Sequence, residues 1–134
     1  MRQNLGAVTV LVPSYDEGLR FYAGCLGFDI IADTDLSPGK RWVLVAPPGG
    51  GQTRLLLAEA TTDEQRRAIG NQAGGRVYLF LHTDDFRRDH ARFLAAGVTF
   101  LEQPRTEAYG TVAVFQDPFG NRWDLLETRE DASP

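Results

Sequence analysis

The sequence has little cysteine, little histidine and no long apolar run, and each shortage excludes a class of protein. Cys25 is the single cysteine, so no disulfide can form within the chain, and its place in a predicted helix favours a small buried residue over a reactive thiol. The longest apolar runs, 55–58 and 77–81, are far shorter than the roughly 20 residues that span a bilayer. We therefore expect no membrane partner.

Basic residues are also sparse. The net charge is −4, and the 14 lysines and arginines form no cluster. Binding to a phosphate backbone needs such a patch, so nucleic acid is not expected as a partner. The first residues, 1–13, lead directly into a strand pattern without an export signal, which predicts a cytoplasmic protein. A hydrophobic fraction of 43% is ordinary for a globular chain with a buried core.

The first half of the chain predicts a strand, a helix and three strands. Ser14 followed by Glu17 is the pattern of a capping box, which marks the start of a helix, and Gly27 is typical of a helix end. Alternating or apolar runs bounded by turn residues predict the strands, which cover 6–12, 28–34, 41–47 and 53–60.

The second half repeats this order. Asp84 or Asp85 is expected to cap a helix that follows the strand 76–83, and three further strands are predicted at 98–104, 111–117 and 121–127. Between the halves, Thr61 with Glu64 predicts a second capping box and a short helix, followed by a flexible connector over 71–75. The chain is therefore an internal repeat of two βαβββ units.

Four segments carry a family resemblance: "LRFYAGCLGF" in the first helix, the "RWVLVAPPGGG" hairpin, the "LAAGVTF" junction and the closing "DPFGNRWDLLE". Together they resemble the glyoxalase, bleomycin resistance and extradiol dioxygenase family, the vicinal oxygen chelate superfamily. The resemblance implies an α+β fold in which two βαβββ units form cupped mixed β-sheets, and a homodimer. It implies one domain over 1–134, composed of a unit at 4–60, a linker at 61–75 and a unit at 76–128.

Metal-dependent members of this family hold a divalent ion with four ligands, from the first and fourth strands of each unit. The corresponding first-strand positions here are Ala7 and Tyr78, and the fourth-strand positions are one of the residues 54–56 and Asp124. One carboxylate cannot supply the roughly three protein ligands that a catalytic metal needs. The two histidines, His82 and His90, have no metal-binding spacing. We therefore predict no metal and no cofactor.

Asp124 has two interpretations without a metal. A buried carboxylate needs a partner, and Arg54, Arg122 or the Tyr78 hydroxyl would make Asp124 a structural residue. Alternatively, burial in the cup raises its pKa and makes it a general base or a substrate anchor. Tyr78 and Asp124 are accordingly the candidate catalytic residues.

Several other residues are candidates for ligand binding. Trp42 could stack on a flat ligand, and Tyr109 precedes a strand where a loop could close. Phe80 shares the strand face of Tyr78 by the period of two. Each also has a plain structural interpretation as a core, turn or surface residue. The full predicted set is Trp42, Arg54, Tyr78, Phe80, Tyr109 and Asp124.

The leading functional hypothesis is metal-independent binding of a small apolar or aromatic molecule in the cup of the sheets, as in the antibiotic-sequestering branch of the family. The alternative is a lyase, isomerase or dioxygenase-type enzyme of the same superfamily, which could depend on a metal. A third is a structural dimer module whose cup is filled by its own side chains.

Overall fold

The computed structural model describes residues 1–129. The chain consists of two compact units, the first ending at Ile69 and the second beginning at Gly70. As the sequence predicts, each unit begins with a strand and a helix; three strands follow in the first unit, whereas in the second β6 and β7 replace one predicted strand, so that four follow. None of the helices in the described part of the chain has the length and apolar character needed to cross a membrane.

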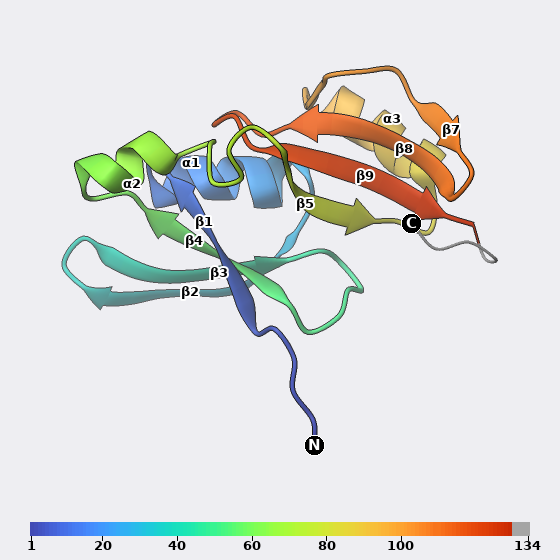
Figure 1. Ribbon diagram of the computed structural model, residues 1–134. Helices are drawn as coiled ribbons and strands as arrows, with labels where there is room; N and C mark the ends of the chain where they lie inside the picture. The colour runs from blue at the N-terminus through green and yellow to red at the C-terminus, as the bar shows by residue number, and fades with distance from the viewer. Residues whose placement is uncertain (130–134) are drawn as a thin grey trace. The chain divides into compact units, whose positions relative to one another are not determined.

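The first unit is a four-stranded sheet with a helix on one face (Figure 1). The sheet order is β1-β4-β3-β2, with β1 parallel to β4 and the other pairs antiparallel. Its strands are β1 (Ala7–Val12), β2 (Asp29–Ser37), β3 (Lys40–Ala46) and β4 (Arg54–Glu59). The helical segments are α1 (Tyr15–Leu19), the π-helix η1 (Arg20–Cys25) and α2 (Asp63–Ala68).

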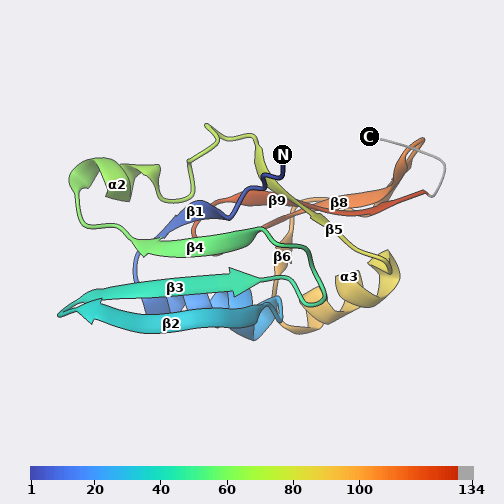
Figure 2. The ribbon, with the colours of Figure 1, turned by 90° about the horizontal axis from the view of Figure 1, so that it is seen from below.

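The second unit has the strand order β5-β9-β8-β6 (Figure 2), and β7 pairs with β8 beside this path (Figure 1). Strand β5 runs parallel to β9, as β1 does to β4. Its elements are β5 (Val77–His82), α3 (Phe86–Ala95), β6 (Thr99–Phe100), β7 (Arg105–Glu107), β8 (Gly110–Gln116) and β9 (Arg122–Thr128).

In each unit one face of the sheet is packed on its helix. In the first unit Val10, Val12, Val43 and Val45 are fully buried. Gly18 of α1 lies so close to the sheet that an added Cβ would come within 3.1 Å of Leu57 and of Val12. In the second unit a chain of ring contacts joins α3 to the sheet, from Phe93 through Phe115 to Trp123.

The helix starts follow the sequence closely, with one correction. The Ser14 hydroxyl accepts a hydrogen bond from the Glu17 backbone at 3.1 Å, and Asp85 is the cap of α3. The predicted capping box at Thr61 and Glu64 is wrong by one residue. The cap of α2 is Thr62, whose hydroxyl accepts from the backbone of Gln65, while the Gln65 side chain accepts from the Thr61 backbone.

Two further segments differ from the prediction. The strand expected over 98–104 is only two residues long, because the Glu102 carboxylate accepts a hydrogen bond from the Val114 backbone at 2.9 Å and takes a place that a strand would occupy. Pro104 has no N–H to continue the ladder. The first helix continues as a π-helix, in which Leu26 donates to the Phe21 carbonyl five residues earlier. Pro104 is a sequence signal for the end of the strand, whereas no sequence signal predicted the π-helix.

Candidate functional site

The first unit carries a pocket of about 520 Å³, lined mainly by the sheet face opposite its helix and also by Tyr15 of α1. Side chains alternate along each strand, so residues two apart share a face. Thr9 and Leu11 of β1 are paired in register with Leu56 and Ala58 of β4, and all four line the pocket together with Trp42 of β3. The wall is thus mostly apolar, with one large aromatic ring.

Trp42 lies on a two-stranded ribbon. Strand β3 pairs with β4 only through residues 43–45, whereas its pairing with β2 continues to the turn between Ser37 and Lys40. A register shift lies between Asp35 and Ser37, and Leu36 in this shift also lines the pocket. Such irregularities can redirect a side chain. Trp42 and Leu36 are 41% and 54% exposed, so the ribbon presents apolar surface to a ligand.

Arg41 connects this ribbon to helix α1. Its guanidinium donates to both carboxylate oxygens of Asp33, at 3.1 and 2.8 Å, and to Asp16 of α1 at 2.9 Å. It also lies 5.2 Å from the centre of the Tyr15 ring. The bonds to Asp33 and Asp16 raise the pKa of Arg41 further above its usual range, and the bond from Arg41 lowers the pKa of Asp33. The positive charge of Arg41 is therefore already neutralised.

Arg54, a predicted ligand residue, is paired in register with Ala7, and its side chain donates to the Gly51 carbonyl at 3.0 Å. It is not among the residues that line the pocket.

Asp124 lies on the face of the second sheet opposite α3. It is paired with Phe80 on one side and with Val114 on the other. Within residues 1–129 its buried Oδ1 atom has no hydrogen-bond partner. Burial raises the pKa of Asp124, the positive charge of Arg105 opposes this rise, and Glu102 adds to it. The predicted arginine partners are used elsewhere, since Arg122 donates to the Gly75 carbonyl and Arg54 to that of Gly51.

The other candidates of the second unit lie around this strand pair. Phe80 is 60% exposed. The ladder shifts register between Val77 and Leu79, so strict alternation does not extend from Tyr78 to Phe80. Burial raises the pKa of the Tyr78 hydroxyl. Tyr109 lies in the turn between β7 and β8, where its side chain interacts with Arg105 and its carbonyl accepts from the backbone of Arg129.

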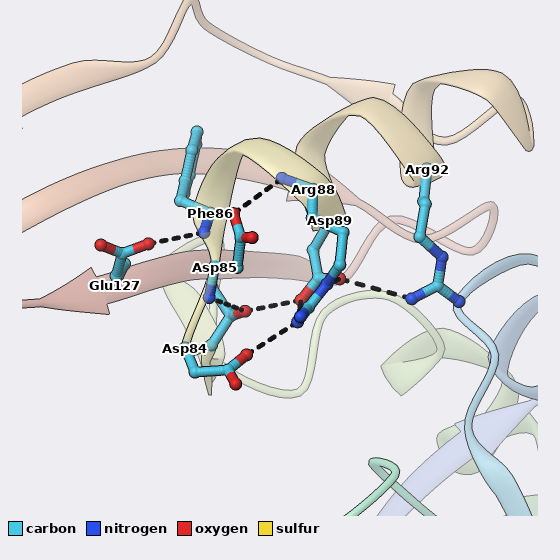
Figure 3. A network of polar contacts seen from close by, with 8 residues as sticks. Asp84, Asp85, Phe86, Arg88, Asp89, Arg92 and Glu127 are labelled. Carbon is cyan, nitrogen blue, oxygen red and sulfur yellow. Dashed lines mark hydrogen bonds and ion pairs between the residues drawn. The ribbon is translucent and has the colours of Figure 1, made fainter.

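Two glutamates fix the correspondence between the units. Glu59 at the end of β4 accepts a hydrogen bond from the Tyr15 backbone at the start of α1. Glu127 near the end of β9 accepts from the Phe86 backbone at the start of α3, at 2.7 Å (Figure 3). Leu56 and Asp124 each lie three residues before one of these glutamates, so they occupy equivalent positions in the two units. The strand register agrees with this assignment, because Leu56 pairs with Thr9 of β1 and Asp124 pairs with Phe80 of β5.

This correspondence resolves the fourth-strand position that the sequence left open among residues 54–56. The equivalent of Asp124 is Leu56, which lines the apolar pocket. Within residues 1–129 no group of three or more His, Cys, Asp or Glu side chains is placed to hold a metal ion.

The "DPFGN" turn has a structural role. The buried Asp117 accepts three backbone hydrogen bonds at one oxygen, from Phe119, Gly120 and Asn121, and its other oxygen accepts from the Asn121 amide at 2.7 Å. The positive φ of 114° at Gly120 favours glycine there. The carboxylate therefore shapes the turn that leads into β9.

Sequence reasoning did not find most of the pocket. Thr9 and Leu11 could have been found from the alternation of β1 against the buried Val10 and Val12. The place of Leu36 in the pocket lining depends on a register shift, for which the sequence has no signal.

A second pocket of about 410 Å³ lies between α3 and the segment after β6, lined in part by His90, Leu94 and Phe100.

Comparison with known proteins identifies the family. The model of the glyoxalase, bleomycin resistance protein and dioxygenase superfamily matches residues 4–125, and the chain belongs to this family. A protein of Shewanella frigidimarina without a characterised function is 50% identical, over 97% of both chains.

Two solved structures are similar over nearly the whole chain. UcmS2 is 30% identical with a TM-score of 0.81, and the match covers 94% of this chain and 98% of that one. TnmS3, an antibiotic binding protein from Streptomyces sp. CB03234, is 30% identical with a TM-score of 0.76, and the match covers 96% and 98%. The α+β fold of two βαβββ units is thereby confirmed.

Proposed function

We propose that this protein binds a small apolar or aromatic molecule, without a metal ion, on the open face of the first sheet. The observation that carries the proposal is the pocket of about 520 Å³, which is within the usual range of small-molecule sites. Leu11, Leu56 and Ala58 form an apolar floor, and Trp42 stands beside it with 41% of its surface exposed. An exposed tryptophan beside an apolar floor suits a flat ligand.

The similarity to TnmS3 supports a binding role, because that protein is described as binding an antibiotic and shares the fold at 30% identity. The correspondence of Leu56 with Asp124 supports binding without a metal, because the fourth strand of the first unit offers an alkyl side chain where a ligand oxygen would be needed. The ligand-binding roles predicted for Arg54, Tyr78, Phe80 and Tyr109 are separate proposals, because none of these residues lines this pocket.

One observation favours an enzyme as the second candidate. The Asp124 carboxyl is partly buried, its Oδ1 has no partner in the described residues, and its pKa is raised. Unpaired carboxyls with raised pKa values are typical of general bases, and Phe80 and Tyr78 on the neighbouring strand would contact the substrate.

Tryptophan fluorescence tests the binding proposal. Trp42 is exposed and Trp123 is 3% exposed, so a ligand in the pocket should quench only Trp42. Saturable quenching by an aromatic compound is expected in the native chain and should disappear in Trp42→Phe. Trp42→Ala should weaken binding, measured by calorimetry, by about 1 kcal/mol or more.

Ile30→Ala is the matched control for Trp42→Ala. Ile30 is an exposed apolar residue of β2 outside the ribbon; it does not line the pocket, and it is paired with Val45 of the helix-packed face. Its replacement should leave binding unchanged. Equal losses of affinity in both variants, or no saturable quenching by any of a panel of aromatic compounds, would contradict the proposal.

We also propose that the chain forms a homodimer. Strand β2 is an edge of its sheet and exposes Ile31, which is 44% accessible. Light scattering of the purified protein should give twice the mass of one chain.

A further inference from the structure

We infer that the ligand of the pocket in the first unit carries a negatively charged group beside its aromatic or apolar body, and that Lys40 binds this group. The inference rests on the proposed function and specifies the class of ligand. It follows from the charges around the pocket and from the way β3 places them.

Lys40 and Trp42 lie on the same face of β3, because side chains alternate along a strand. Two residues along a strand span roughly 7 Å, about the width of a fused pair of aromatic rings. Both residues line the pocket. A ligand ring stacked on Trp42 would therefore place a substituent on its edge within reach of the long Lys40 side chain.

Lys40 is the cation of this pocket that has no partner. Within residues 1–129 its ammonium group makes no hydrogen bond or ion pair. The neighbouring Arg41 also borders the pocket, but its guanidinium is bound by Asp33 and Asp16. The Arg41 side chain is directed to Tyr15 and Asp16, whereas Lys40 shares the strand face of Trp42.

Gln65 adds a second unused donor to the pocket lining. Its side-chain oxygen accepts from both the backbone and the hydroxyl of Thr61, at 2.8 and 3.1 Å. This orients the amide so that its NH₂ group, which has no acceptor in the described residues, is available to a ligand oxygen. The one carboxylate of the lining, Glu59, accepts from the Tyr15 backbone instead. Unused donors thus favour a ligand with an anionic group.

Two fluorescent probes with nearly the same rings test this inference. Anilinonaphthalene sulfonate carries a negative charge, and phenylnaphthylamine is its uncharged counterpart. Each is titrated into the native chain, Lys40→Gln and Arg67→Gln. Arg67 is an exposed arginine of α2 that does not line the pocket, so its replacement controls for the loss of one positive charge.

In Lys40→Gln the affinity for the sulfonate should fall by about threefold to tenfold, as expected for a partly exposed charged hydrogen bond, while the affinity for the neutral probe stays the same. Arg67→Gln should bind both probes like the native chain. Equal affinities of Lys40→Gln and the native chain for the sulfonate would overturn the inference while the binding proposal stands. Failure of both probes to quench Trp42 in the native chain would overturn both.

Protection from acylation provides an independent measurement, because Lys40 is the only lysine in the sequence. Mass spectrometry can follow acetylation of Lys40, with the amino group of Met1 as the internal reference. The sulfonate should slow acetylation of Lys40 relative to Met1, and the neutral probe should slow it less. Equal protection by both probes would show that the charge is not recognised and would overturn the inference.

Discussion

Leu56 and Asp124 occupy equivalent positions in the two units, each three residues before a glutamate that accepts a hydrogen bond from the start of a helix. The repeat therefore places an alkyl side chain in one unit where the other has a carboxylate. The partner of Leu56 in the parallel ladder is Thr9, and that of Asp124 is Phe80. This difference determines what each sheet face can bind.

The first prediction concerns metal content. One carboxylate binds divalent ions weakly, because no chelate effect compensates the hydration that the ion loses. Purified protein should contain well under one equivalent of Zn, Ni, Fe, Mn or Co, and a chelator should not lower its melting temperature, since a bound ion would stabilise the native state. A near-stoichiometric ion coordinated by Asp124 would contradict this prediction and favour a metal-dependent enzyme.

The second prediction concerns the pH dependence of stability. Burial raises the pKa of Asp124 above its ordinary value of 3.8, so in the interval between the two values the folded chain holds a proton that the unfolded chain has released. The free energy of unfolding then falls as pH rises through this interval. Asp124→Asn removes this loss, so the variant should melt at a higher temperature than the native chain at neutral pH.

Melting curves of both proteins from acid to neutral pH measure this difference. The comparison isolates Asp124 from Asp33 and Asp89, two carboxyls with lowered pKa values whose effect has the opposite sign and is common to both proteins. A variant that is less stable than the native chain at neutral pH would show that the Asp124 carboxylate has a stabilising partner.

The third prediction separates two adjacent basic residues. Arg41→Gln removes the ion pairs of Arg41 with Asp16 of α1 and with Asp33 of β2. It should therefore lower the melting temperature and speed amide exchange over residues 34–42. This loss should shrink at high salt. Lys40→Gln should leave both quantities unchanged. Equal effects of the two substitutions on stability would contradict the division of roles between them.

The fourth prediction concerns the turn before β9. Asp117→Ala leaves three backbone N–H groups and the Asn121 amide without their acceptor, and it should lower the free energy of unfolding by at least about 2 kcal/mol. Denaturant titration measures the change. Asp35→Asn, at an exposed carboxylate of β2, is the control and should stay within about 0.5 kcal/mol. Similar free energies of unfolding for the two variants would contradict the structural role of Asp117.

The sequence was sufficient for most of the fold because its signals there are local. Ser14 and Asp85 cap their helices through side chains next to the backbone that they bind, and the "DPFGN" turn is shaped by Asp117 within five residues. The prediction of a strand over 98–104 was wrong in length, because the end of this strand depends on a contact with a residue distant in the sequence. There the Glu102 side chain, rather than a strand backbone, binds the N–H of Val114.

The site was harder to predict for the same reason. Trp42 was found because an aromatic residue in an alternating strand is visible in the sequence, but Lys40 gains its role only from the fact that Arg41 is neutralised by Asp16 and Asp33. One of the two interpretations of Asp124 pairs it with Arg54, Arg122 or the Tyr78 hydroxyl, and the two arginines donate to carbonyls instead. Such pairings depend on three-dimensional distances that a strand pattern does not contain.

The most direct test of the central claim is an NMR titration of the native chain with anilinonaphthalene sulfonate, followed through the two tryptophan indole N–H signals. The indole signal of Trp42 should shift saturably, together with the amides of Leu11, Leu56 and Lys40, while the signal of the buried Trp123 remains in place. Shifts confined to the second pocket, at His90, Leu94 and Phe100, or no saturable shift at Trp42, would contradict a ligand site on the open face of the first sheet.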